Sequence, residues 1–165
     1  MRSTAPLHTL GNLQLLDLYK VAFLCSRTCP PAAQEASLAW AAAQCEQGTC
    51  VISGYHSRVE REVLYRLLEG SQPIVIALAR GIMKNIEPVV MKGIDAGRLL
   101  IVTRYAESVT HACEDSCYHR NRLMVEMADE AVVAWVAPGG NLERLCREVA
   151  DLKVSHIYQP TEVEL

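Results

Sequence analysis

The sequence predicts an α/β fold of three layers, in which helices cover both faces of a mainly parallel β-sheet. The first reason is that short apolar runs alternate with helix-forming stretches along the chain, a pattern typical of parallel strands joined by crossover helices. The second is that these runs lack strict hydrophobic–polar alternation, as expected of strands buried on both faces.

Length and composition indicate one globular domain. The chain has 165 residues, 50% of them hydrophobic and 21% charged, with a net charge of −3. That charge argues against coating nucleic acid through bulk positive charge. No apolar run reaches the length of about 18 residues that a membrane span needs, and the N-terminus lacks the apolar core of a signal peptide. We expect a cytoplasmic chain whose seven cysteines are thiols.

The first strand and helix begin after an N-terminal extension, residues 1–19, which we expect to be helical. The domain itself is expected to cover residues 20–165. Residues 20–26, KVAFLCS, form an apolar run that ends in small polar residues, as a buried strand does. The alanine-rich stretch 30–48 predicts a helix with prolines in its first turn and Gly48 at its end.

The middle of the chain repeats this alternation. Residues 49–53 predict a strand, and 57–70 predict an amphipathic helix that ends at a glycine. Residues 72–79 predict the third strand. A weaker helix is expected over 85–97, followed by a fourth strand over 98–103.

The last third contains a polar stretch, HACEDSCYHRNR, at residues 111–122. We expect a loop here, leading into one or two helical turns over 120–128. Residues 131–137 predict the fifth strand and 142–152 a helix. A short edge strand is expected at 155–159.

Ligands of parallel sheets bind beyond the carboxyl ends of the strands, and arginines gather at these predicted ends. Arginine carries a fork of donors that matches phosphate. The arginines at or just beyond predicted strand ends are Arg27, Arg58, Arg80, Arg104, Arg120 and Arg122. This grouping predicts an anion site at that edge.

The loop SGYHSRVE joins the second strand to its helix. Gly54 permits a tight turn, and the free N–H groups of a helix start favour an anion. Ser57 and Glu60 also have capping-box spacing, which needs only helix stability. Both interpretations stay open.

The loop PGGN before the last helix is a second candidate. Gly139 and Gly140 would let a ligand approach the backbone, and Asn141 could cap the helix. A plain strand–helix connection is the alternative. Neither loop has a Walker A or G-x-G-x-x-G pattern, and we expect no cofactor.

Histidines and cysteines in the polar stretch could in principle bind a metal: His111, Cys113, Cys117 and His119. Zinc takes four such ligands. Their spacing is not the usual Cys-x2-Cys arrangement, and free cysteine often packs as a small hydrophobe. We therefore expect no bound metal.

The order of these motifs resembles the DNA-processing protein A (Smf) family. It consists of CSR after the first strand, SG after the second, and RNR before a strand that starts AVV. The family pattern S-G-x-x-x-G-[IV]-D is matched at Ser53, Gly54 and Val59, whereas Arg58 replaces Gly and Glu60 replaces Asp. The family consists of Rossmann-like proteins that bind single-stranded DNA and load a recombinase on it.

The resemblance implies a Rossmann-like domain in a divergent, stand-alone form, because the family's helical N-terminal module and C-terminal winged helix are not matched. It implies non-catalytic binding of single-stranded nucleic acid or nucleotide phosphate, with a recombination protein as possible partner and a homodimer or higher oligomer. The predicted binding residues are Ser26, Arg27, Ser53, Gly54, Arg58, Arg120, Asn121, Arg122, Gly139 and Gly140.

Two alternatives remain at this point. The Lonely-Guy phosphoribohydrolases share the superfamily fold and carry R-K-x-x-M and P-G-G-x-G-T-x-x-E. Arg120 and Met124 fit the first motif and residues 138–140 begin the second, but the Gly-Thr is missing and Glu143 comes too early. The other alternative is a non-catalytic nucleotide-sensing or structural subunit. We expect a binding protein rather than an enzyme.

Overall fold

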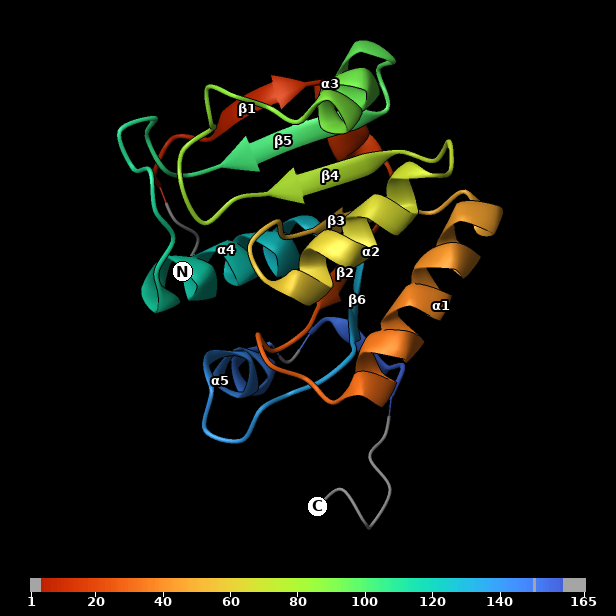
Figure 1. The fold of residues 1–165 in the computed structure, drawn as a ribbon. Coiled ribbons are helices and arrows are strands. Elements are labelled where there is room, and N and C mark those ends of the chain that lie inside the picture. Colours follow the sequence, from red (N-terminus) through yellow and green to blue (C-terminus); the bar gives the residue numbers. More distant parts are fainter. Residues whose placement is uncertain (1–3, 150, 159–165) are drawn as a thin grey trace.

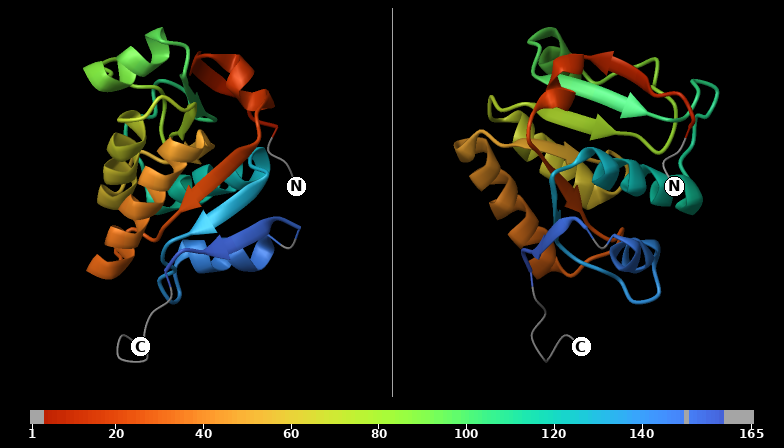
Figure 2. Two further views of the ribbon diagram at one scale, coloured as in Figure 1. Left: turned by 90° about the vertical axis from the view of Figure 1, so that its right-hand side faces the viewer. Right: turned by 180° about the vertical axis from the view of Figure 1, so that it is seen from behind.

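The computed structural model describes residues 4–149 and 151–158, and its central feature is one seven-stranded sheet. The strand order is β1-β5-β4-β3-β2-β6-β7, and every pairing is parallel except that of β1 with β5 (Figures 1 and 2). The predicted mainly parallel α/β fold is therefore confirmed. The strands are β1 (His8–Gly11), β2 (Lys20–Leu24), β3 (Cys50–Ser53), β4 (Ile74–Ala77), β5 (Leu99–Thr103), β6 (Glu130–Val133) and β7 (Lys153–His156).

Helices cover both faces of the sheet and give the predicted three layers. They are α1 (Pro31–Gln47), α2 (Arg58–Leu68), α3 (Pro88–Asp95), α4 (Glu114–Met127) and α5 (Asn141–Glu148). Alternate residues of the central strands enter two separate cores. Val51 and Ile76 pack with α1, α2 and α3, whereas Ile52 and Val75 pack with α4 and α5. The strands are buried on both faces, which explains why they lack a polar alternation in sequence.

The N-terminal segment differs from the expected helical extension. Within its described residues it contributes the edge strand β1 and one 3-10 helix (Leu13–Asp17). The side chain of Asn12 caps this short helix, accepting from Gln14 N, and it also donates to the carbonyl of Gly97 at 2.8 Å. Gly11 lies so close to the backbone of β5 that a Cβ there would collide with Leu99 O. A glycine at this close approach and an Asn cap tie the segment to the sheet.

The polar stretch 111–122 was expected to be a loop, and this expectation was wrong. Helix α4 begins at Glu114, inside the stretch, with Cys113 as its N-cap. The Cys113 sulfur accepts from Ser116 N at 3.4 Å, and Ser116 Oγ accepts from Cys113 N at 2.9 Å. Cysteine is not among the favoured N-cap residues, so the cap gives no ordinary sequence signal. The acidic first turn, Glu114 and Asp115, is the one feature typical of a helix start here.

The C-terminal edge strand begins earlier than expected. β7 spans Lys153–His156 and pairs with β6, whereas the sequence predicted a strand at 155–159, of which residue 159 lies outside the described residues. None of the described helices is long and apolar enough to cross a membrane.

Candidate nucleic-acid interface

A cleft of about 410 Å³ opens at the carboxyl edge of the sheet. Four segments line it: the β2–α1 connection, the β3–α2 connection, the first half of α4 and the β6–α5 connection. They meet because parallel strands end at the same edge. The cleft brings together six of the predicted residues, namely Ser26, Arg27, Arg120, Asn121, Gly139 and Gly140.

The β3–α2 connection is held by a cap of the predicted kind. Ser57 is the N-cap of α2, and its Oγ accepts from Glu60 N at 3.3 Å. The carboxylate of Glu60 turns back and accepts from His56 N at 2.9 Å. The loop therefore contains the expected helix cap. The carboxylate of Glu60 accepts from the residue before the N-cap rather than from the N-cap itself.

Arg120 lies at the floor of the cleft with its charge paired. Its residue is 3% exposed, and its Nη2 and Nη1 donate to the two carboxylate oxygens of Glu60 at 2.9 and 3.3 Å. Nη1 also lies 3.4 Å from the carbonyl of Ala77, and Nε donates to Asn121 Oδ1 at 2.9 Å. We expected Arg120 to supply free charge to a ligand, but the structure places its guanidinium in a buried ion pair.

Gly54 provides the room for that pair. A Cβ at this position would collide with the guanidinium of Arg120 and with the carboxylate of Glu60. Ser53, just before it, ends β3 and is fully buried, and its Oγ has no hydrogen-bond partner among the described residues. Neither Ser53 nor Gly54 lines the cleft.

The β2–α1 connection carries the cation that is available at the cleft. Arg27 is exposed and makes no ion pair or hydrogen bond within the described part of the chain. Its neighbour Ser26 is half-buried and accepts from Ala137 N at 2.8 Å, while Ser26 N donates to Trp135 O at 2.9 Å. Ser26 thus joins the ends of β2 and β6 and places Arg27 beside the β6–α5 connection.

The β6–α5 connection offers backbone donors to the cleft. Gly139 has a left-handed φ of 74°, and Gly140 is the N-cap of α5 without a side-chain cap. Asn141, expected to cap this helix, instead donates through its amide to Glu114 O at 3.1 Å. The first N–H groups of α5 are therefore free of any side-chain cap, and such a helix start favours an anion.

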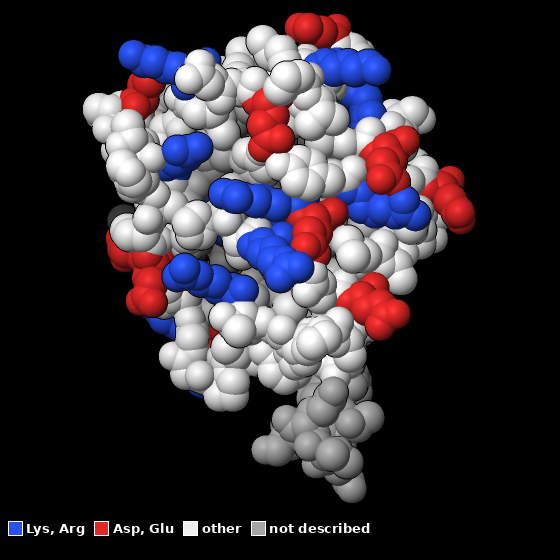
Figure 3. Space-filling view, viewed as in Figure 1, with Lys and Arg blue, Asp and Glu red and all other residues white. Residues whose placement is uncertain are grey.

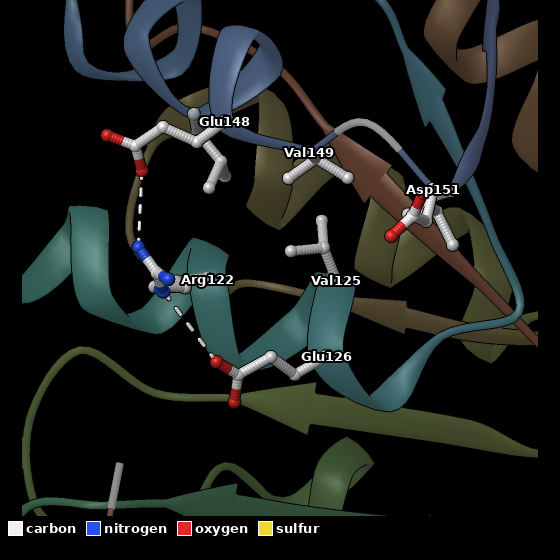
Figure 4. Close-up of a pocket in the computed structure, with 8 residues that line it drawn as sticks. Arg122, Val125, Glu126, Glu148, Val149 and Asp151 are labelled. Carbon is white, nitrogen blue, oxygen red and sulfur yellow. Dashed lines mark hydrogen bonds and ion pairs between the residues drawn. The ribbon is translucent and has the colours of Figure 1, made fainter. Parts of the chain in front are cut away.

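Two predicted arginines lie outside the cleft. Arg58 points into solvent, with its side chain 84% exposed and bonded to Glu62 at 2.9 Å. Arg122 pairs with Glu148 at 3.2 Å and Glu126 at 3.6 Å beside another pocket of about 360 Å³ between α4 and α5 (Figure 4). Residues two apart on a helix point to nearly opposite sides, so Arg120 lines the cleft and Arg122 does not. Both arginines border a further pocket of about 500 Å³ beside α4.

The edge also holds residues that the sequence reasoning missed. His56 lines the cleft, and Tyr55 and Arg61 lie with Arg80 around a smaller pocket beyond the β3–α2 connection. The guanidinium of Arg61 lies 5.9 Å from the ring centre of Tyr55. Burial lowers the pKa of His56, and nearby arginines lower it further against the opposing effect of Glu60. Figure 3 shows Lys and Arg side chains gathered along and beside α2, with acidic side chains between them.

The family of the chain follows from a comparison with protein-family models. Residues 2–143 match the model described as DNA recombination-mediator protein A. The chain belongs to this family. The resemblance first inferred from the CSR, SG and RNR motifs is thereby confirmed, and no curated protein sequence matches the chain.

Solved structures of DNA processing protein A show the same fold. The protein from Streptococcus pneumoniae matches with a TM-score of 0.74 at 18% identity, over 94% of this chain and 56% of that one. The protein from Helicobacter pylori, whose structure is described for its single-stranded DNA binding mode, matches with a TM-score of 0.68 at 20% identity, over 86% and 65%. This DNA recombination-mediator protein A family member thus spans 56% and 65% of those two proteins.

The residues of the phosphoribohydrolase and metal hypotheses are only partly gathered at the cleft. Arg120, Cys113 and Cys117 line it, whereas Met124, Glu143, His111 and His119 do not. Glu143, compared above with the phosphoribohydrolase glutamate, pairs with Arg147 and does not line the cleft. His119 lies 3.5 Å from Asp115, and His111 lies beside Thr110. Among the described residues, no three His, Cys, Asp or Glu side chains are grouped so that they could hold a metal ion.

The thiols around the cleft differ in their chemistry. Burial raises the pKa of Cys25 and of Cys117, which keeps both protonated. Hydrogen bonds from Ser116 lower the pKa of exposed Cys113. In this family member, Cys25 packs in the core beside α1 and α2, whereas Cys117 is half-buried at the cleft wall.

Proposed function

We propose that this chain binds single-stranded DNA without catalysis, through phosphate contacts at the carboxyl edge of its sheet. The observation that carries the proposal is the position of Arg27, an exposed guanidinium without a carboxylate partner among the described residues, in one cleft with the uncapped start of α5. Membership in the recombination-mediator family, and the shared fold with a protein described for single-stranded DNA binding, support DNA as the ligand.

The charge distribution along the edge supports a strand rather than a single phosphate. Arg27, Arg61 and Arg80 lie in or just after the connections that follow β2, β3 and β4, and none of these arginines pairs with a carboxylate within the described residues. Tyr55 adds an aromatic ring on which a base could stack. Such a local row can attract a polyanion although the net charge is −3. Phosphate contacts carry little sequence information, so binding should be nearly independent of sequence.

The family description also supports a partner. A recombination mediator acts together with a recombination protein, and we propose such a protein as the partner of this chain. We further propose self-association into a homodimer or higher oligomer. Size measurement of the purified protein, alone and mixed with a recombinase, tests both.

Fluorescence anisotropy with a labelled oligothymidylate of about 20 nucleotides tests the DNA proposal. At about 50 mM salt the parent should bind, and log K should fall with log salt by about 0.7 per neutralised phosphate. Arg27→Ala should weaken binding about tenfold and remove one contact from the slope. Arg147→Ala is the matched control, because Arg147 is exposed on α5 outside the cleft and pairs with Glu143.

Two results would contradict the proposal. One is a parent protein that binds no oligonucleotide at low salt. The other is Arg27→Ala binding as tightly as the parent. Release of free base from AMP by the parent would move the assignment to the phosphoribohydrolase alternative.

A further inference from the structure

We propose that Glu60 and Arg120 are positioning residues of this site, which bind each other rather than the DNA strand and hold the β3–α2 connection in the shape that receives phosphate. The inference rests on the proposed function. The RNR motif indicated that Arg120 is a phosphate ligand. The inference assigns it a positioning role instead.

The pair connects the two helical layers across the end of the sheet. Arg120 belongs to α4 on one face, and Glu60 to α2 on the other. Nη1 of Arg120 also reaches the carbonyl of Ala77 at the end of β4. One guanidinium therefore links α4, β4 and α2 at the point where the chain leaves β3 for the cleft.

The contacts of Glu60 transmit this link to the backbone of the connection. Its Oε2 accepts from His56 N at 2.9 Å while it faces Arg120 Nη1 at 3.3 Å. Its backbone N–H donates to the N-cap Ser57. The backbone of the connection at His56 therefore depends on where the carboxylate is held.

Arg120 lines the floor of the cleft, but burial leaves its side chain almost no surface for direct contact with a strand. The side chain of Arg120 is 2% exposed and that of Glu60 is 9% exposed. Moving the guanidinium out to a phosphate would leave a carboxylate buried without its partner, which is strongly unfavourable. Gly54 adds a steric argument, because the backbone passes so close to both side chains that even a Cβ would collide with them.

Two substitutions distinguish a positioning role from direct DNA binding by their effects on DNA affinity. Glu60→Ala removes a negative charge beside the cleft and frees Arg120, so direct binding by Arg120 predicts tighter binding of labelled oligothymidylate. Positioning predicts binding weaker by about tenfold. Arg120→Lys keeps the charge but loses the fork of donors; positioning predicts a similar loss, whereas a phosphate ligand would be largely replaced by lysine. The salt slope should stay at the parent's value in both variants, because no phosphate contact is removed.

Hydrogen exchange of the DNA-free proteins gives an independent test. The amides of residues 54–58 should exchange faster in both variants than in the parent, while exchange in the strands of the sheet stays unchanged. Two exposed residues that do not touch the pair provide matched controls. Glu69→Ala removes a carboxylate at the C-cap of α2, and Arg147→Lys makes the same Arg-to-Lys exchange on α5. Should Glu60→Ala fail to fold, Glu60→Gln has the same shape and serves in its place.

The outcomes distinguish this inference from the proposed function. A parent that binds no oligonucleotide overturns the proposed function, while faster exchange at 54–58 would still support the positioning role. Tighter DNA binding by the Glu60 variant, full retention of affinity by Arg120→Lys, or unchanged exchange at 54–58 overturns the positioning role.

Discussion

The two strand–helix connections that flank the cleft, β3–α2 and β6–α5, are built in opposite ways. The first is braced by buried side chains: Arg120 and Glu60 pair beneath it, and Gly54 leaves just enough space for them. The second has two glycines, of which Gly139 is exposed, with a positive φ and nothing near its missing Cβ, and Gly140 is half-buried. This connection is held mainly by Ser26 and Asn141.

The difference shows how one edge can combine a fixed surface with an adaptable one. A connection braced by a buried ion pair keeps one shape, because leaving either charge unpaired is costly. A glycine connection with few contacts can adjust and lets a ligand approach its backbone. We therefore expect the β3–α2 connection to be preformed and the β6–α5 connection to change on binding.

Gly54→Ala should break the braced side of this comparison and have the largest effect. The added methyl group must displace either the guanidinium of Arg120 or the carboxylate of Glu60. Overpacking together with a disrupted buried pair should lower the free energy of unfolding by about 3 kcal/mol or more. Urea denaturation measures it, and a loss below about 1 kcal/mol would show that the pair is not fixed in place.

Gly139→Ala is the matched change on the adaptable side. There is space for the methyl group, so only the left-handed backbone conformation is penalised. The expected loss in free energy of unfolding is about 1 kcal/mol, clearly less than for Gly54→Ala. Equal losses in the two alanine variants, measured in the same urea titration, would remove the contrast between the connections.

Ser26→Ala tests whether the β6–α5 connection can be loosened without affecting the β3–α2 connection. It removes the acceptor for Ala137 N, which holds the β6–α5 connection against the end of β2. We expect a loss of about 1 kcal/mol in unfolding free energy and faster amide exchange at Ala137, with no change at residues 54–58. Faster exchange in both connections would mean that they are coupled rather than independent.

Substitution of His56 should have the smallest effect on stability, and it tests the electrostatic environment of the β3–α2 connection. Its pKa in the folded protein is lowered by burial and by neighbouring arginines. The unfolded chain then takes up the proton more readily, so this contribution to stability is present above the unfolded pKa of about 6.5 and is lost as pH falls through that value. Unfolding of His56→Gln compared with the parent, from about pH 7.5 to 5, should show a shallower acid loss in the variant. A steeper loss would contradict this sign.

The fold could be predicted well from the sequence because strands that are buried on both faces, such as β2, β4 and β5, consist almost entirely of apolar residues. The site could be predicted only in part. Topology correctly brought Ser26, Arg27 and Gly139 to one edge. It could not show that Arg120 would be buried, because pairing with Glu60 depends on helices from opposite faces meeting at the sheet end.

Two other features could not be predicted from the sequence. The start of α4 uses Cys113 as its cap, so the first half of this helix was expected to be a loop. β1 is only four residues long and is fixed by pairing with β5, which lies far along the chain. Non-local partners of this kind leave little trace in a single sequence.

Amide hydrogen exchange of the parent protein, with and without saturating oligothymidylate, tests the central claim most directly. We expect exchange at residues 137–142 and 26–28 to slow on binding, while residues 54–58 are already slow and change little. Protection around Arg122 and Glu148 instead, with no change at 137–142 or 26–28, would place the DNA elsewhere and contradict the account.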